Sequence, residues 1–182
     1  MTRIAPLDPE KLNPRQREVY DAIASSPRGV VRGPLAVWLN RPELADLAQS
    51  LGRYCRYDTL LPPNLSELAI LVTARVWNAE FEWQAHKRIA LSAGVSPAVV
   101  EAIRLNKTPE FSNPDEELVY RFSLSAQRDR QVDKALFDEA VLRFGKEAIV
   151  DLTGFLGYYG LISMTINVFD VDPIDPNNLE MS

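Results

Sequence analysis

Cysteine is nearly missing from this sequence. Cys55 is the single cysteine among 182 residues, so the chain can form no internal disulfide and no cysteine-rich zinc site. This usage fits a reducing compartment, and we expect a cytoplasmic protein. The first sixteen residues, MTRIAPLDPEKLNPRQ, contain no apolar core of the kind that a secretory signal needs, which favours the same location.

Clustered positive charge is also lacking. The 20 lysines and arginines are scattered, and the 25 aspartates and glutamates outnumber them, which gives a net charge of -5 and an isoelectric point near 5.0. We therefore expect no nucleic-acid partner, because phosphate binding needs a clustered basic face.

One long stretch, residues 152–169, has no charged residue and approaches the length of a membrane span. Its glycine, hydroxyl and amide side chains make it too polar for an insertion signal. We expect a buried or intersubunit helix here and no membrane partner. Gly154, Gly157 and Gly160 would let another helix approach one face of it.

Sustained alternation of apolar and polar residues is absent, so no β-sheet is expected. Apolar residues recur at helical spacing instead, and most prolines lie between the helical segments or at their ends. A chain of this length is the size of one domain. We expect a single all-α domain, a helical bundle, with helices over about 13–25, 42–57, 64–77, 79–94, 97–105, 113–128 and 133–144, followed by the long apolar helix.

Within the segment 42–57, the expected apolar stripe is Leu44, Leu47, Ala48 and Leu51. The single domain divides into an N-terminal helix and loop (1–34), a central region (42–105), C-terminal helices (113–169) and an extended tail (170–182). The tail either frays or wraps a neighbouring subunit.

Histidine occurs once, at His86. On a helical projection of 79–94, one stripe contains Ala79, Glu82, Trp83, His86, Ile89, Ala90 and Ala93. Glu82 stands four residues before His86, so the two side chains are neighbours. A buried carboxylate can hold one imidazole nitrogen and leave the other free to transfer a proton. The alternatives are a structural hydrogen-bonded pair or, with the register shifted by one, a solvated pair.

Glu67 has two interpretations. Asn64 and Glu67 fit a capping box, with Asn64 as the N-cap and Glu67 reaching back from the third helical position. Capping could be the whole role of this glutamate.

The run RYDTLLPPNLSELAILVTARVWNAEFEWQAHKRIALSAGVSPAVVEAI, residues 56–103, resembles the carboxymuconolactone decarboxylase-like family, whose superfamily includes alkylhydroperoxidase D. The peroxidase branch has a glutamate, eleven residues, Cys-x-x-Cys, three residues and a histidine. Glu67 and His86 match the glutamate and the histidine at that spacing. The segments GPLAVWLNRPELA and GYYGLISMTINVF also resemble the family.

The two cysteine positions of the peroxidase motif are Ala79 and Glu82 in this chain. Neither can replace a reducing thiolate, so peroxidase activity is not expected. The pattern E-x-x-x-H of Glu82 and His86 resembles the decarboxylase branch instead. That resemblance implies a lyase without metal or organic cofactor, acting on a small carboxylated lactone of aromatic catabolism, and a homo-oligomer, commonly a trimer or hexamer.

Several residues are candidates beside the expected catalytic set of His86, Glu82 and Glu67. Arginine matches the planar carboxylate, so Arg53, Arg56 or Arg75 could bind a substrate carboxylate. Aromatic side chains that could line an apolar pocket are Tyr54, Trp77, Trp83 and Tyr158. Each of these could equally be an ion-pairing or core residue, and Cys55 is expected to be a small buried hydrophobe.

Three other functions stay open. The chain could be a thiol peroxidase that uses Cys55, or a catalytically silent binding or assembly protein of the same fold. A metal site of Glu67, Glu82 and His86 is the third, because two carboxylates and an imidazole suit a divalent ion. The proton-transfer apparatus could also serve an isomerisation or a hydrolysis.

Overall fold

A computed structural model describes residues 2–181 of the chain, and within these residues the secondary structure is helical throughout, without a strand. The elements are η1 (Pro9–Lys11), α1 (Pro14–Ala24), α2 (Pro34–Trp38), α3 (Pro42–Tyr57), α4 (Pro63–Trp77), α5 (Glu80–Ser92), α6 (Pro97–Arg104), α7 (Pro114–Leu124), η2 (Ser125–Asp129, a π-helical turn), α8 (Lys134–Phe144) and α9 (Lys146–Phe169). The all-α prediction is confirmed.

Most helices begin where the sequence predicts. Six of them have proline in the first turn, where its missing N–H costs no hydrogen bond and its fixed φ suits a helix. Asn13 and Gln16 form a complete capping box at the start of α1. The short elements η1 and α2 were not predicted, because three or five residues carry too little periodicity to detect.

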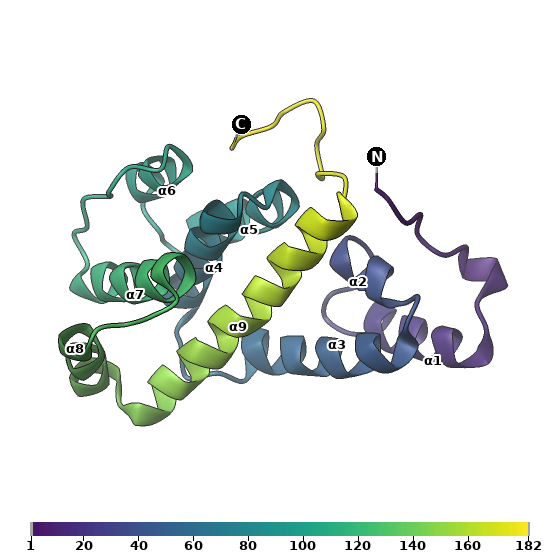
Figure 1. Cartoon of the computed structure of the whole chain (residues 1–182), viewed down its shortest axis with the longest axis horizontal. Helices are drawn as coiled ribbons and strands as arrows, with labels where there is room; N and C mark the ends of the chain where they lie inside the picture. The colour runs from purple at the N-terminus through teal and green to yellow at the C-terminus, as the bar shows by residue number, and fades with distance from the viewer. Residues whose placement is uncertain (1, 182) are drawn as a thin grey trace.

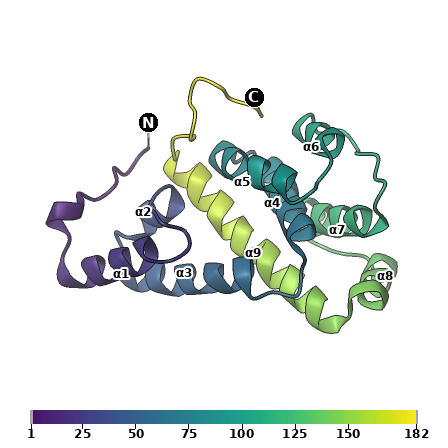
Figure 2. The same cartoon turned by 180° about the vertical axis from the view of Figure 1, so that it is seen from behind.

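The long helix α9 runs diagonally across the molecule, with α1, α2 and α3 on one side and α4 to α8 on the other (Figure 1 and Figure 2). It is long and apolar enough to cross a membrane by length and composition, but 61% of its most apolar window is buried inside the protein. This is the pattern of a core helix, as the sequence indicated for residues 152–169.

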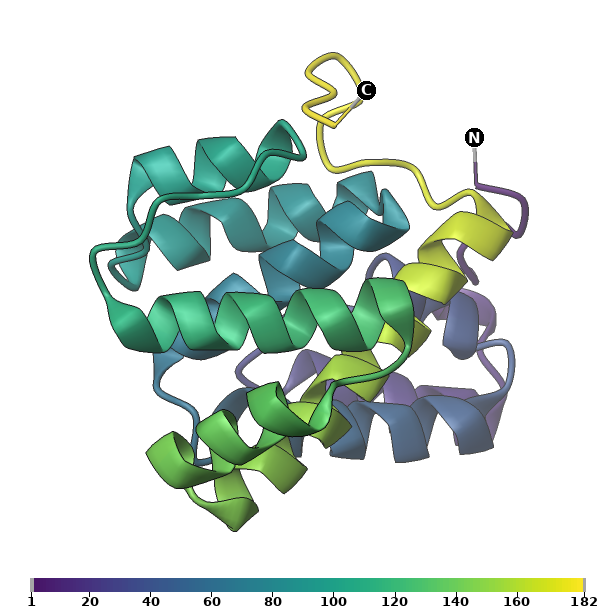
Figure 3. The same ribbon diagram turned by 60° about the vertical axis from the view of Figure 1, so that its left-hand side comes forward.

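The apolar core lies on two sides of α4, which explains why that helix is apolar nearly all round. Ala69 and Ile70 of α4 belong to the cluster around α9, whereas Leu68 and Leu71 belong to a second cluster with α5 and α6. Figure 3 shows α6 and α7 stacked against the α4 and α5 pair. The helix that carries Glu67 is therefore held from both sides.

The predicted apolar stripe of α3 is wrong for its three leucines, and only its fourth member, Ala48, is buried. Leu44, Leu47 and Leu51 are exposed, with Leu47 at 74%, whereas Ala45, Ala48, Gly52 and Cys55 face the core. The small residues of α3 are the buried ones because the helix packs closely against α1, α2 and α9. The leucines are left on an outer face.

The C-terminal tail neither frays nor extends away from the subunit in this structure. Both carboxylate oxygens of Glu80, at the start of α5, accept backbone N–H bonds from Glu180 and Met181, at 2.9 and 3.0 Å. Lys87 forms an ion pair with Glu180, and Gln84 bonds the backbone of the tail. The tail therefore lies along the outer face of α5, as Figure 3 also shows.

Candidate active site

The tight turn between α4 and α5 brings the candidate catalytic residues together. Asn78 takes the left-handed conformation, with φ of 54°, and ends α4 just before α5 begins. The two helices then pack along one another, with more contacts than any other pair in the described chain. Glu67 of α4 thereby faces His86 of α5 although nineteen residues separate them.

His86 lies between two glutamates. Its Nδ1 is 2.7 Å from Oε2 of Glu67, and its Nε2 is 3.0 Å from Oε1 of Glu82. All three side chains are buried, with His86 at 4% exposed. The ring of Tyr159 packs edge-on against the imidazole, with 5.5 Å between the ring centroids. The sequence predicted that Glu82 and His86 are neighbours, and the structure adds the carboxylate of Glu67 at the other ring nitrogen.

Two expectations about this cluster need correction. Neither nitrogen of His86 is free, because Glu67 occupies the one that Glu82 was expected to leave open. Glu67 also forms no capping box, since the N-cap of α4 is Pro62, two residues before Asn64, and no side chain caps the helix. Asn64 instead donates to Glu116 of α7 at 3.0 Å.

The charges around His86 favour its protonated form. Burial lowers the pKa of His86, but the charge of Glu82 and the hydrogen bonds to both glutamates outweigh burial and raise the pKa to about 9. At neutral pH the ring is therefore an imidazolium that donates Nδ1–H to Glu67 and Nε2–H to Glu82. The cluster stores one proton between two carboxylates.

A cavity of about 110 Å³ opens beside this cluster. It is walled by α2, α3, α5, α9 and the loop before α2, and the residues that line it are Arg28, Val30, Arg32, Pro34, Leu35, Arg56, Phe81, Glu82, Ala85, His86, Tyr158, Tyr159 and Ile162. Glu82 and His86 reach the cavity, whereas Glu67 stands behind the imidazole. The cavity therefore lies directly beside the protonated His86 and its partner Glu82.

Gly33 fixes one wall of this cavity. It precedes α2 with φ of 58°, and a Cβ added there would overlap the ring of Phe81. Only glycine tolerates both the left-handed backbone and this close approach. The Phe81 ring thus packs directly on the loop that brings Arg32 to the cavity.

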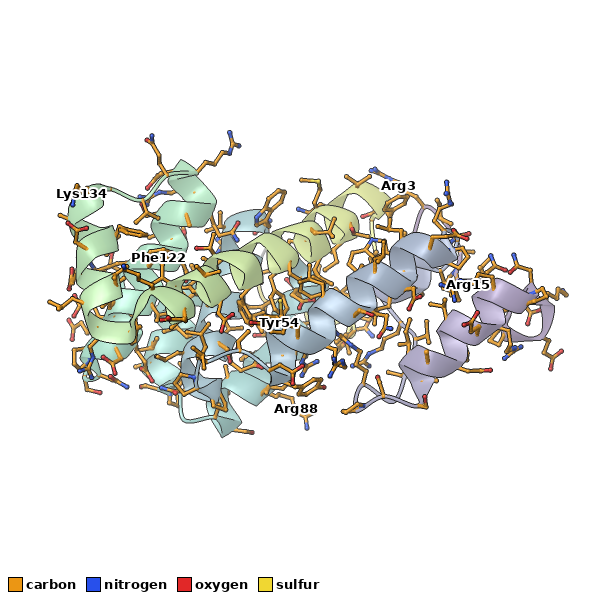
Figure 4. All side chains as sticks on the ribbon, turned by 90° about the horizontal axis from the view of Figure 1, so that it is seen from below. Arg3, Arg15, Tyr54, Arg88, Phe122 and Lys134 are labelled. Carbon is orange, nitrogen blue, oxygen red and sulfur yellow. The ribbon has the colours of Figure 1, made fainter. Side chains whose placement is uncertain are left out.

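Two of the candidate substrate-binding residues on α3 lie away from the cavity. Arg53 is exposed and pairs with Asp58 at 3.2 Å. Tyr54 donates its hydroxyl proton to Asp151 of α9 at 2.6 Å, and Figure 4 shows it on α3 where the two helices meet. Neither residue lines the cavity beside His86.

The other candidates divide between the cavity and the core. Arg75 bonds Asn78 at the end of α4, and Trp83 is buried in the second core cluster with its Nε1–H directed at Glu180. Trp77 lines a larger groove, of about 560 Å³, between α7 and α9. Tyr158 and Arg56 do line the cavity beside His86.

Sequence reasoning missed Arg28, Arg32 and Tyr159, all of which line the cavity. Arg28 and Arg32 belong to the turn-forming segment SPRGVVRGP, whose pattern predicts a loop but not where its side chains point. Tyr159 follows Tyr158 in α9, and this tyrosine pair was the one signal that could have drawn attention to it.

Cys55 is 1% exposed in the core, as expected, and burial raises the pKa of its thiol to about 11. A thiol of this kind holds little thiolate at neutral pH, so it makes a poor nucleophile. Within residues 2–181, no group of three or more histidine, cysteine, aspartate or glutamate side chains is arranged to hold a metal ion. Glu67 and Glu82 contact opposite sides of the imidazole and do not converge on one point.

Residues 42–116 match the model of the carboxymuconolactone decarboxylase family. The matched region runs from the start of α3 into α7 and includes Glu67, Glu82 and His86. A search of curated proteins finds no match to this sequence.

Solved structures share the fold at low sequence identity. A structure described as an alkylhydroperoxidase AhpD core, an uncharacterized peroxidase-related protein from Ralstonia eutropha JMP134, has a TM-score of 0.77 at 18% identity and covers 96% of this chain and 93% of its own. The debrominase Bmp8, as a cysteine-to-alanine variant in complex with 2,3,4-tribromopyrrole, has a TM-score of 0.74 at 19% identity and covers 94% and 91%. A peroxidase-related protein from Silicibacter sp. TM1040 has a TM-score of 0.75 at 13% identity, with the same coverage.

Proposed function

We propose that this chain, whose residues 42–116 match the model of the carboxymuconolactone decarboxylase family, is a cofactor-free decarboxylase-like enzyme acting on a small carboxylated lactone or a related acid. The observation that carries the proposal is the buried Glu67–His86–Glu82 cluster with one carboxylate, Glu82, at the wall of a small cavity. Each member of the cluster has a distinct role in moving one proton.

Decarboxylation consumes one proton. Loss of carbon dioxide leaves the electron pair of the broken carbon–carbon bond on the substrate, and that carbon then takes up a proton. The protonated cluster is suited to this step, because His86 stores the proton and Glu82 stands between it and the substrate. Glu82 takes the proton from Nε2 of His86 and passes it to carbon, which leaves a neutral imidazole and an ionised Glu82, and a proton from water restores the imidazolium after the product leaves.

Glu67 acts through the histidine. It accepts the Nδ1–H bond at 2.7 Å and does not line the cavity. A carboxylate in this place fixes the orientation of the ring and stabilises the imidazolium, so Glu67 is a positioning residue. The buried site strengthens these interactions because little water competes for the charges.

A peroxidase function has less support. The positions of the family's cysteine pair are Ala79 and Glu82, and Cys55 is a buried thiol whose pKa lies near 11. The fold that this chain shares with peroxidase-related proteins does not supply the missing nucleophile. We expect Cys55→Ala to leave turnover unchanged, which distinguishes the proton-transfer enzyme from a thiol enzyme.

The test is carbon dioxide release from a panel of carboxylated lactones formed in aromatic catabolism. His86→Gln should keep the fold, because glutamine offers hydrogen-bonding groups of similar reach. Its turnover should fall about 10²-fold to 10⁴-fold, the usual contribution of a placed proton-transfer group. Arg88→Gln is the matched control, since Arg88 is exposed on the same helix, does not line the cavity and lies at the edge of the molecule in Figure 4.

Glu82→Gln should also lose activity, and the double variant should lose far less than the product of the two single losses, because residues that act as one unit are not additive. Melting is measured on the same preparations. Unchanged specific activity in folded His86→Gln would overturn the proposal and favour a silent assembly protein, in which both substitutions would lower only the melting temperature.

A further inference from the structure

Two buried polar atoms in the cavity have no hydrogen-bond partner beyond each other within the described part of the chain. They are Nη2 of Arg28 and Oη of Tyr158. Tyr158 is only 2% exposed, and both residues line the cavity together with Glu82 and His86. The two groups are neighbours, and Arg28 acts on Tyr158 through its charge and a side-chain hydrogen bond, but no other described residue bonds either atom. Buried polar groups are nearly always satisfied, so this pair of donors indicates a further partner.

The two atoms meet at Gly52. A Cβ added to this glycine would overlap both Oη of Tyr158 and Nη2 of Arg28. Gly52 is therefore needed on α3 so that a guanidinium from the loop and a phenol from α9 can reach the same small space. A hydrogen-bond acceptor placed there would satisfy both groups.

The charge of the cavity favours an acceptor that is an anion. Arg28, Arg32 and Arg56 all line the cavity, and none of them forms an ion pair with another described residue. Glu82 is the one carboxylate in the lining, and it is already engaged with His86. The whole chain has a net charge of -5, so the excess of arginine over acidic residues is a local feature of this cavity.

We propose that Arg28 and Tyr158 form a subsite for the carboxylate group of the substrate, with Arg56 adding positive charge from α3. Guanidinium offers N–H donors in a plane that matches a carboxylate. Burial raises the pKa of Tyr158 to about 12, although Arg28 opposes the shift, so the phenol keeps its proton and donates it. A carboxylate has acceptor oxygens for a bond from each of the two groups.

Arg28 and Tyr158 both lie outside residues 42–116, the region that matches the family. Proton transfer is thus assigned to the matched region, and recognition of the anionic group is assigned to the loop before α2 and to α9. This inference deepens the proposed function and rests on it for the identity of the natural ligand. Binding of an anion can nevertheless be measured without turnover.

The test is calorimetric titration of the purified protein with 2-furoate, a five-membered ring bearing one carboxylate, and with 2-furamide, its uncharged analogue. We expect 2-furoate to bind and 2-furamide to bind at least about tenfold more weakly. Arg28→Gln should weaken 2-furoate binding about tenfold to a hundredfold, the effect of losing a hydrogen bond to a charged group. Tyr158→Phe, which removes only the hydroxyl, should weaken it about threefold to tenfold.

Matched controls are Arg41→Gln, which removes the same charge from a side chain 79% exposed at the start of α3, and Tyr120→Phe, which removes a half-buried hydroxyl that lies elsewhere. Both should bind 2-furoate as the unmodified protein does. Circular dichroism checks that each variant is folded, and Tyr158→Phe keeps the test decisive if Arg28→Gln does not fold.

Three results would overturn the subsite. The first is equal affinity for 2-furoate and 2-furamide, and the second is no detectable 2-furoate binding to the unmodified protein. The third is 2-furoate binding that both Arg28→Gln and Tyr158→Phe leave unchanged. Binding that depends on Arg28 and persists in His86→Gln supports it. If that binding is found while no lactone releases carbon dioxide, the subsite stands and the proposed function fails. If carbon dioxide release depends on His86 but not on Arg28, the proposed function stands and the subsite fails.

Discussion

The charge on His86 can be observed directly, because it is the only histidine in the chain. Its imidazole signals in an NMR titration belong to one residue, without overlap from others. We expect a pKa of about 9 in the unmodified protein and a lower value in Glu82→Gln, since the charge of Glu82 is the strongest influence that raises it. A midpoint near the ordinary value of 6.5 in the unmodified protein would contradict the buried ion cluster.

The same residue links stability to pH. The pKa of His86 is raised from 6.5 in the unfolded chain to about 9 in the folded protein. Its contribution to the free energy of unfolding is therefore complete below about pH 6.5 and is lost as pH rises through about 9. Urea unfolding from pH 6 to pH 10 should show this decline in the unmodified protein. His86→Gln, in which position 86 carries no titrating group, should show a smaller one.

At the scale of the element, α5 is held by contacts on two faces. Its inner face carries Glu82 and His86, and its outer face binds the C-terminal tail through Glu80, Gln84 and Lys87. The tail thus holds in place the helix that carries Glu82 and His86 to the cavity.

The carboxylate of Glu80 gives a direct test of this contact. Glu80→Gln keeps one acceptor oxygen but loses the charge and the second backbone bond, so the free energy of unfolding should fall by about 1–2 kcal/mol in urea. Glu43→Gln, whose side chain is 65% exposed at the start of α3, is the control and should change it by less than about 0.5 kcal/mol. Equal unfolding midpoints for the two variants would show that the tail does not stabilise α5.

At the scale of the whole molecule, α3 and α9, which lie side by side (Figure 4), each leave apolar side chains exposed. The exposed residues there are Leu44, Leu47, Leu51, Val150, Leu161, Met164 and Val168. Gly154 and Gly157 of α9 also open onto solvent, with no atom near the position of an added Cβ. Exposed apolar side chains in these numbers mark a site of association, and we propose that α3 and α9 take part in the contacts between subunits of a homo-oligomer.

Light scattering tests this proposal. We expect a mass that is a multiple of 20.5 kDa at micromolar concentration, and Leu47→Glu should lower it, because a buried unpaired charge strongly destabilises an interface. Leu105→Glu, on an exposed leucine at the end of α6, should leave the mass unchanged. A mass near 20.5 kDa for the unmodified protein would contradict the proposal.

The sequence by itself determined the helices and the pair at the centre of the site. Proline and asparagine signals act over a few residues, so they predicted the starts of α1, α3, α6 and α7. The i,i+4 spacing of Glu82 and His86 likewise depends only on helix geometry. The match of residues 42–116 to the family model agrees with the resemblance that residues 56–103 indicated.

Only the tertiary structure decided what surrounds that pair. Glu67 reaches the second nitrogen of His86 because two helices pack, and Arg28 and Tyr158 meet at Gly52 because a loop and two helices converge. The outward direction of Leu47 has the same origin, since close packing selects the small residues of α3 for the core. Local periodicity reports which residues share a face, but which face is buried depends on partners far away in the chain.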